Sequence, residues 1–145
     1  MTRWPDPIRR VALWVYEALW IILTPIVWLY LQKRGKRDPL YAAHIGERFG
    51  HYSSPIKGAI WVHAVSLGEM RSATPLIRAI LARGETVVTT HFTPAGRREA
   101  QREFASEIAA GTLQSLWVPY ETSRAYRRFL KAFKPRLGLV MEIEV

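Results

Sequence analysis

Four short apolar runs, each separated from the next by a helical pattern, occupy residues 59 to 145. They begin at about residues 59, 86, 114 and 137, as in AIWVHAV at 59–65 and TVVTTHF at 86–92. This spacing leaves room for one helix between successive strands, and strands that alternate with helices form parallel sheets through right-handed crossovers. The sequence therefore predicts an α/β, Rossmann-like fold whose parallel sheet is covered on both faces. Because no Gly-x-Gly-x-x-Gly follows the first strand, the dinucleotide-binding fingerprint is missing.

The segments between the runs carry the signals that begin and end helices. Apolar residues recur at helical spacing from Met70 to Leu81, and Gly84 is placed to end that helix. Thr93 followed by Pro94 is typical of an N-cap and a first helical position. Thr122 or Ser123 caps a last helix that Pro135 ends, with an apolar stripe formed by Tyr126, Phe129, Leu130 and Phe133.

An apolar run of 21 residues, Val11 to Leu31, precedes this domain and holds Glu17 as its only charge. As a helix it would measure about 30 Å, the thickness of the hydrocarbon core of a bilayer. We expect Pro25 to kink or split this helix. The sequence predicts a membrane anchor with its basic flank at residues 1–37 and a Rossmann-like domain at 38–145. A buried helix or an interfacial hairpin is the alternative.

Charge and composition favour an anionic partner and a membrane. The formal net charge is +9, from 21 basic and 12 acidic residues, and four of the six tryptophans lie in the first thirty residues. Basic residues are more frequent after the apolar run than before it, which favours a cytoplasmic domain. There is no cysteine, so disulfides, thiolate metal sites and cysteine nucleophiles are excluded. A nucleic-acid-binding domain is the weakest interpretation, because no exposed aromatic-basic platform is evident.

A carboxylate follows the first strand at the position where α/β sheets bind ligands. Ser66-Leu67-Gly68-Glu69 puts Glu69 on the first turn of a helix, just beyond the carboxyl end of the strand. Gly68 would let the backbone come close to a ligand. From the residues alone, the alternative is that Glu69 only neutralises the helix N-terminus, with Ser66 as the cap.

Two further sets of residues have a structural alternative. The turn from Thr93 to Gly96 could bind a phosphate at a helix N-terminus, or act as a plain N-cap. We expect Arg71, Arg97 and Arg98 to be solvated on an exposed helix face. We expect His63 to be a core histidine or one that supports a neighbouring site residue, rather than a metal ligand, because no Asp or His lies at ligand spacing from it, and no metal is implied.

The order of several motifs resembles the amino-terminal half of 3-deoxy-D-manno-octulosonic acid (Kdo) transferases, which act in lipopolysaccharide core biosynthesis. The resemblance spans nearly the whole chain. After the apolar anchor, the motifs are Gly46-Glu47-Arg48-Phe49-Gly50, His63-Ala64-Val65-Ser66-Leu67-Gly68-Glu69, Thr89-Thr90 with Thr93-Pro94-Ala95-Gly96, Val118-Pro119-Tyr120, and Met141-Glu142-Ile143-Glu144.

The resemblance implies a fold and roles for single residues. The family has the two-domain GT-B architecture, in which the amino-terminal domain receives the lipid acceptor and the carboxyl-terminal domain binds CMP-Kdo. Glu69 matches the family's proton acceptor. Glu142 matches a carboxylate that stabilises the transition state, with Glu144 as its rival. Residues placed at the substrate are Ser66, Gly68, Thr93, Gly96 and Arg48. For Glu47 and Arg48 a structural ion pair is favoured over acceptor contact.

The resemblance also defines the expected function. It implies transfer of Kdo from CMP-Kdo to a lipid A precursor (lipid IVA) at the cytoplasmic side of the cell inner membrane, without a cofactor or nucleic acid. The family's Met-Glu-Thr-Glu-Leu is Met-Glu-Ile-Glu-Val here, and Trp-Pro-Asn does not follow it. We therefore expect a truncated chain that lacks the donor domain and is inactive by itself. The alternative is a non-catalytic, membrane-anchored module that binds anionic lipid.

Overall fold

The computed structural model describes residues 7–141 of the chain. Two compact units are present, residues 1–43 and residues 44–145. The first contains the apolar helix and the second contains the sheet.

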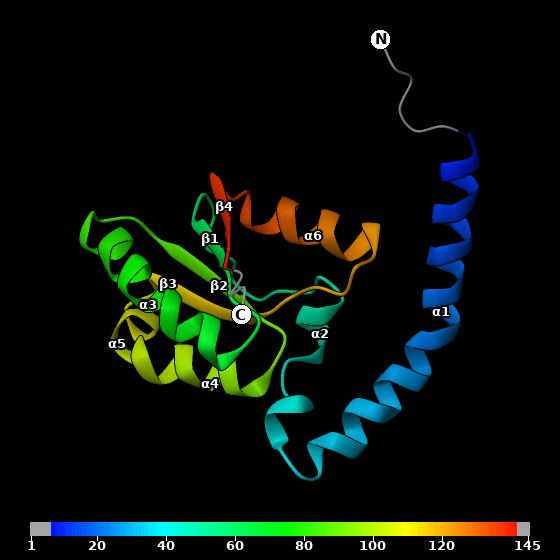
Figure 1. Ribbon diagram of the computed structural model, residues 1–145, viewed down its shortest axis with the longest axis horizontal. Helices are drawn as coiled ribbons and strands as arrows, with labels where there is room; N and C mark the ends of the chain where they lie inside the picture. Colours follow the sequence, from blue (N-terminus) through cyan, green and yellow to red (C-terminus); the bar gives the residue numbers. More distant parts are fainter. Residues whose placement is uncertain (1–6, 142–145) are drawn as a thin grey trace. The chain divides into compact units, whose positions relative to one another are not determined.

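The first unit is dominated by α1, a helix of 29 residues from Pro7 to Gly35. By length and composition this helix is able to cross a membrane, as the apolar run predicted. It continues through Pro25, so the predicted split does not occur, and Figure 1 shows that its axis bends part-way along. Thr24, just before the proline, donates from Oγ1 to the Trp20 carbonyl at 2.7 Å. A short 3-10 helix, η1 (Pro39–Tyr41), follows α1.

The second unit is built on a parallel sheet of four strands in the order β3-β2-β1-β4. The strands are β1 (Ile60–His63), β2 (Val87–His91), β3 (Leu113–Trp117) and β4 (Leu137–Val140). β1 pairs with both β2 and β4, with Ile60 opposite Val87 on one side and Leu137 on the other. The predicted strands and their parallel arrangement are confirmed.

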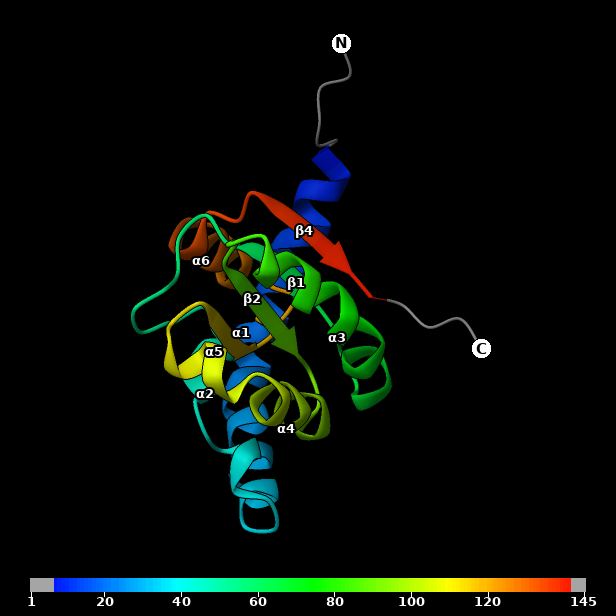
Figure 2. The ribbon, with the colours of Figure 1, turned by 90° about the vertical axis from the view of Figure 1, so that its left-hand side faces the viewer.

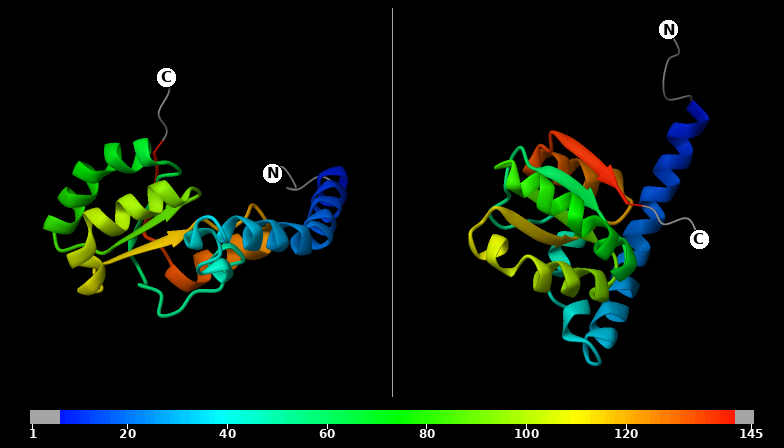
Figure 3. Two further views of the ribbon diagram at one scale, coloured as in Figure 1. Left: turned by 90° about the horizontal axis from the view of Figure 1, so that it is seen from below. Right: turned by 60° about the vertical axis from the view of Figure 1, so that its left-hand side comes forward.

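Five helices accompany this sheet in the described part of the second unit. They are α2 (Ile45–Arg48), α3 (Leu67–Ala82), α4 (Pro94–Glu103), α5 (Ala105–Ala109) and α6 (Ser123–Phe133). As Figures 2 and 3 show, α3, α4 and α5 cover one face of the sheet and α6 covers the other. The predicted covering of both faces is therefore confirmed.

Side-chain caps explain where the three longer helices begin. Ser66, Thr93 and Thr122 have extended backbones, and each side-chain oxygen accepts a hydrogen bond from the N–H group three residues later. Thr93 and Pro94 take the predicted positions, and Thr122 rather than Ser123 caps α6. Gly84 follows the end of α3 with φ of 77°, a left-handed conformation that glycine adopts without steric cost.

Alternation along the strands sends apolar side chains into two cores. Val62 and Val87 pack with Met70 and Ile77 of α3, on the side of α3 and α4. Ala59 and Val88 pack on the other side with Phe129 and Phe133 of α6. Leu130, predicted on the apolar stripe of that helix, is instead 46% exposed.

β4 forms one edge of the sheet and is the least covered strand. Leu137 and Val140 are 51% and 68% exposed. At Gly138 the backbone of β4 lies close to the side chain of Trp61 on β1, since an added Cβ would meet Cε3 of the Trp61 ring at 3.1 Å. Its outer side has no strand partner among the residues that the structure describes.

Candidate functional site

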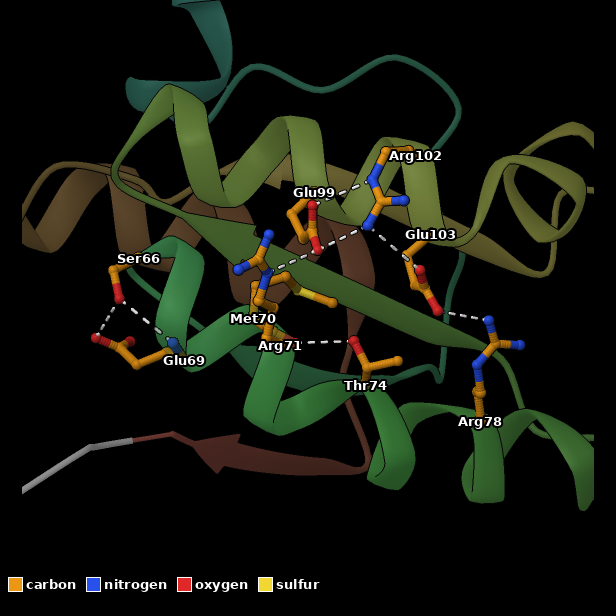
Figure 4. A network of polar contacts seen from close by, with 9 residues as sticks. All are labelled: Ser66, Glu69, Met70, Arg71, Thr74, Arg78, Glu99, Arg102 and Glu103. Carbon is orange, nitrogen blue, oxygen red and sulfur yellow. Dashed lines mark hydrogen bonds and ion pairs between the residues drawn. The ribbon is translucent and has the colours of Figure 1, made fainter.

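The turn between β1 and α3 holds the carboxylate of Glu69 at the carboxyl edge of the sheet. Ser66 Oγ accepts from the Glu69 N–H at 3.4 Å and donates to Glu69 Oε1 at 3.1 Å, as Figure 4 shows. The other oxygen, Oε2, accepts from the Val65 N–H at 2.5 Å. The arrangement is similar to a capping box, in which the carboxylate three residues after the N-cap reaches back to the start of the helix, but the N–H that it binds here belongs to Val65, one residue before the N-cap. Glu69 is half-buried and Gly68, beside it, is exposed.

The junction between β2 and α4 fastens this turn from the neighbouring strand. The Val65 carbonyl accepts from the N–H groups of Phe92 at 3.3 Å and Thr93 at 3.1 Å. It also accepts from Thr93 Oγ1 at 3.0 Å. At Gly96 an added Cβ would lie 3.1 Å from the backbone C and O atoms of Ser66, so the glycine permits close contact between α4 and the turn.

His91 makes a second attachment to the same turn. It is fully buried, and its Nδ1 lies 2.8 Å from the Ala64 carbonyl, which can only accept. The proton is therefore on Nδ1, and Nε2 accepts from Thr89 Oγ1 at 3.0 Å. Burial, together with the positive charge of Arg97, lowers the pKa of His91 to about 4. The ring is thus neutral at pH 7 and holds the turn as a hydrogen-bond donor.

His63 lies on the opposite side of the sheet from His91, as the alternation of side chains along the paired strands requires. Its Nδ1 is 2.9 Å from Thr90 Oγ1, and the same oxygen accepts a hydrogen bond from Trp61 Nε1 at 2.8 Å. Burial lowers the pKa of His63, while the Thr90 hydrogen bond and the charge of Glu69 oppose that shift. Among the described residues no group of three His, Asp or Glu side chains is placed to hold a metal ion.

The Glu47 carboxylate forms an ion pair, but its partner is Arg97 rather than its neighbour Arg48. Arg97 donates from Nη1 to Oε2 at 2.7 Å and from Nη2 to Oε1 at 3.2 Å, and the Trp117 N–H donates to Oε2 at 2.8 Å. Arg97 is 2% exposed, which corrects the prediction that it is solvated on the surface of α4.

A helical pattern could have revealed the burial of Arg97. The residue lies three and seven positions before Ala100 and Phe104, both of which are fully buried, so all three share one face of the segment. The charge of the arginine concealed this pattern, because charged residues are seldom buried without a partner. Its partner lies 50 residues earlier in the chain.

Arg48 is also buried, at 2% exposed, and lies over the Trp117 ring at 4.1 Å from its centroid. The Arg97 guanidinium lies 4.8 Å from the same ring centroid, so two cations contact one indole. Arg48 Nη2 further donates to the Phe92 carbonyl at 3.4 Å. Through this hydrogen bond Arg48 supports the loop that follows β2. Its predicted contact with the substrate stays a prediction.

The turn predicted to bind phosphate is largely occupied by its own hydrogen bonds. The Gly96 N–H donates to Thr93 Oγ1 at 3.3 Å, and the Arg97 N–H donates to the Thr93 carbonyl at 3.2 Å. Gly96 itself is buried. The structure therefore shows the N-cap, which was the alternative, and phosphate binding at this turn stays a prediction.

Salt bridges join the exposed sides of α3 and α4, as Figure 4 shows. Arg71 Nε and Arg102 Nη2 contact Glu99 Oε1 at 3.0 and 2.9 Å. Arg78 Nη2 contacts Glu103 Oε1 at 2.6 Å. Arg71, which was predicted to be merely solvated, is therefore part of a network that keeps α4 beside the helix that carries Glu69.

The described chain reaches the same edge of the sheet at Met141. Its N–H donates to the His63 carbonyl at 2.8 Å, directly after β4. Glu142 and Glu144 lie outside the described residues, so the predicted role of either one stays a prediction. A hollow of about 390 Å³ lies instead at the amino ends of β2 and β3, where Glu85 and Thr112 line it. It is remote from Glu69.

Comparison with known protein sequences identifies the family of this chain. A family model described as 3-deoxy-D-manno-octulosonic-acid transferase (kdotransferase) matches residues 43–145. This chain belongs to the Kdo transferase family. The matched region includes the whole sheet and every predicted site residue, so the resemblance drawn from the motifs is confirmed.

Individual Kdo transferases match over most of this chain. The 3-deoxy-D-manno-octulosonic acid transferase of Bordetella pertussis is 44% identical over 128 residues, which are 85% of this chain and 30% of that protein. A probable mitochondrial 3-deoxy-D-manno-octulosonic acid transferase of Arabidopsis thaliana is 33% identical over 135 residues, 90% of this chain and 29% of that protein. The chain thus spans about 30% of the length of these relatives. No solved structure matches.

Proposed function

We propose that this domain is the acceptor-binding part of a GT-B Kdo transferase and that Glu69 is its general base. The acceptor is a lipid A precursor, lipid IVA, and the donor, CMP-Kdo, binds to a carboxyl-terminal domain. The observation that carries the proposal is the position of the Glu69 carboxylate, half-buried at the carboxyl edge of a parallel sheet.

The reaction requires one proton acceptor beside the acceptor hydroxyl. As that oxygen forms a bond to the anomeric carbon of Kdo, the bond from this carbon to the phosphate oxygen of CMP breaks, and the hydroxyl proton passes to Glu69. Each Glu69 oxygen accepts one hydrogen bond from the turn. A carboxylate oxygen has capacity for a second, so the turn leaves room for the acceptor hydroxyl.

The surrounding hydrogen bonds support this role because they fix the base. The turn is held at Ala64 by His91 and at Val65 by Thr93, so the Glu69 carboxylate starts from a rigid backbone. Rigid placement of a catalytic group lowers the entropy that the reaction must lose. Glu142 is the proposed partner that stabilises positive charge developing on the sugar.

The proposed location is the inner membrane, with the domain on the cytoplasmic side. The support is α1, which has the length and composition of a membrane span. More basic residues follow its apolar run than precede it. A lipid acceptor would then reach Glu69 from the bilayer. No metal or cofactor takes part in the proposed step.

Two substitutions separate catalysis by Glu69 from the loss of a helix cap. Glu69→Gln in the full-length protein keeps one oxygen that accepts from the Val65 N–H, and its amide NH2 can donate to Ser66 Oγ, but it removes the base, so we expect transfer from CMP-Kdo to lipid IVA to fall by about 100- to 10,000-fold. Lipid IVA should still bind, and thermal stability should change little.

Thr122→Ala is the matched control, because it removes the equivalent N-cap from α6 and leaves the Glu69 turn and its carboxylate unchanged. It should lower stability by about 1 kcal/mol while most transfer activity remains. Transfer would be followed by mass spectrometry of the lipid product. Near-normal turnover in Glu69→Gln, or an equal loss of turnover in both variants, would remove Glu69 as the base.

A further inference from the structure

Helix α6 separates its side chains into a buried side and a basic side. Ala125, Phe129 and Phe133 pack against the sheet and are at most 3% exposed. The basic face of α6 consists of exposed residues at helical spacing on the other side: Arg124, Arg127, Lys131 and Lys134. No acidic residue occurs between Ser123 and Phe133.

This basic face is not neutralised, unlike the opposite side of the domain. On α3 and α4, Glu99 and Glu103 form salt bridges with Arg71, Arg78 and Arg102. Within residues 7–141, by contrast, no carboxylate forms an ion pair with any member of the basic face of α6. The two faces of the sheet, which Figure 2 shows covered by different helices, therefore differ in electrostatic character.

Helix stability does not account for the arrangement. Lys131 and Lys134 lie at the carboxyl end of α6, where positive charge is favourable, but Arg124 lies in the first turn, where it is unfavourable. Leu130 is 46% exposed next to these cations instead of being buried with Phe129. A row of cations with an exposed leucine among them is typical of a surface that contacts lipid headgroups.

With α1 in a bilayer, the short connection after it keeps the second unit close to that bilayer. α1 has the length of a membrane span and ends at Gly35, and residues 36–43 alone separate it from the second unit. Even when fully extended, this connection reaches less than about 30 Å. The local concentration of anionic headgroups around the domain is therefore high.

We propose that the basic face of α6 lies against anionic phospholipid headgroups of the membrane that holds α1. It forms a second, electrostatic contact that orients the domain on the bilayer surface. The contact does not depend on Glu69 being the base. Nucleic acid is the less suitable partner, because α6 offers no exposed aromatic ring for stacking, its one tyrosine, Tyr126, being half-buried.

The absence of cysteine makes a direct test possible. The full chain with Leu130→Cys on α6, or with Gln101→Cys on the exposed side of α4 as the control, is labelled with an environment-sensitive fluorophore. Each protein is then inserted into vesicles of phosphatidylcholine alone or with 30% phosphatidylglycerol. We expect the label at position 130 to brighten in the anionic vesicles and the label at position 101 to be unchanged.

Salt and charge substitutions then test the cause. Raising the salt to 1 M shortens the Debye length to about 3 Å, and should abolish the difference at position 130. Each basic residue near an anionic surface contributes about a fivefold preference. Arg127→Gln with Lys131→Gln should therefore weaken the association about 25-fold, as a titration with phosphatidylglycerol measures it, whereas Arg78→Gln with Arg83→Gln, which removes the same charge from α3 and its carboxyl end, should not.

Several outcomes would overturn the proposal. They are equal brightness at position 130 in both vesicles, an equal response at position 101, or an equal effect of the two charge variants. A response at position 130 to added RNA but not to phosphatidylglycerol would assign the face to nucleic acid instead. The salt measurement keeps all four residues of the basic face in place, so the test stands even if a charge variant folds poorly.

Discussion

Protonation of His91 should make the fold sensitive to mild acid. The pKa of this buried ring is about 4, against an ordinary value of 6.5 in the unfolded chain. As pH falls below 6.5 the unfolded chain binds a proton that the folded chain does not bind until about pH 4. The stability associated with His91 is therefore fully present above pH 6.5 and is lost progressively between 6.5 and 4.

The size of the loss follows from the same two values. A difference of about 2.5 units at 1.36 kcal/mol per unit amounts to about 3 kcal/mol of unfolding free energy. His91→Asn offers a neutral amide near the position of Nδ1, so it can still donate to the Ala64 carbonyl but does not titrate. The variant should be less stable than the natural protein at pH 8 and should lose about 3 kcal/mol less between pH 6.5 and pH 4.

Urea unfolding of the full chain in detergent micelles, followed by circular dichroism at a series of pH values, measures this difference. Titration of carboxylates contributes to both proteins and cancels when the two are subtracted. Nitrogen chemical shifts of the His91 ring would independently report the proton on Nδ1. Parallel pH curves for the two proteins, or a His91 ring that titrates near pH 6.5, would refute the argument.

Three other substitutions test the supports of the Glu69 turn, each by urea unfolding and by transfer assays on the full-length protein. Arg97→Leu leaves the buried Glu47 carboxylate without its cation and should cost about 3–5 kcal/mol, with partial recovery when Glu47→Gln is added; no loss would mean that the pair is not buried in solution. Gly96→Ala places a Cβ against the Ser66 backbone and should cost about 1–3 kcal/mol together with activity; unchanged values would show that the turn yields freely. Thr93→Val removes the cap of α4 and should cost about 1 kcal/mol; a stabilising effect would contradict the capping geometry.

Most of the fold could be predicted because its signals are local. Strands appear as short apolar runs, and the caps at Thr93 and Thr122 depend only on residues within the next turn. The cap at Ser66 and Glu69 could likewise be anticipated from four consecutive residues. The motif order was specific enough to identify the family.

What could not be predicted depends on contacts between distant segments. The strand order β3-β2-β1-β4 is set by tertiary packing, and the pair of Glu47 with Arg97 joins residues 50 positions apart. Arg48 adjoins Glu47 in the sequence but points to Trp117 instead. His91 gave no sign of its role, because a histidine in an apolar strand reveals neither its tautomer nor the carbonyl it binds.

Among residues 7–141, no strand pairs with the outer side of β4, and this has a practical consequence for handling the chain. An edge strand with exposed Leu137 and Val140 is a template for pairing with another molecule. We expect concentrated samples to self-associate through this strand, and light scattering should show smaller particles after Val140→Lys. Soluble preparations will therefore benefit from a charged residue at that strand or from low protein concentration.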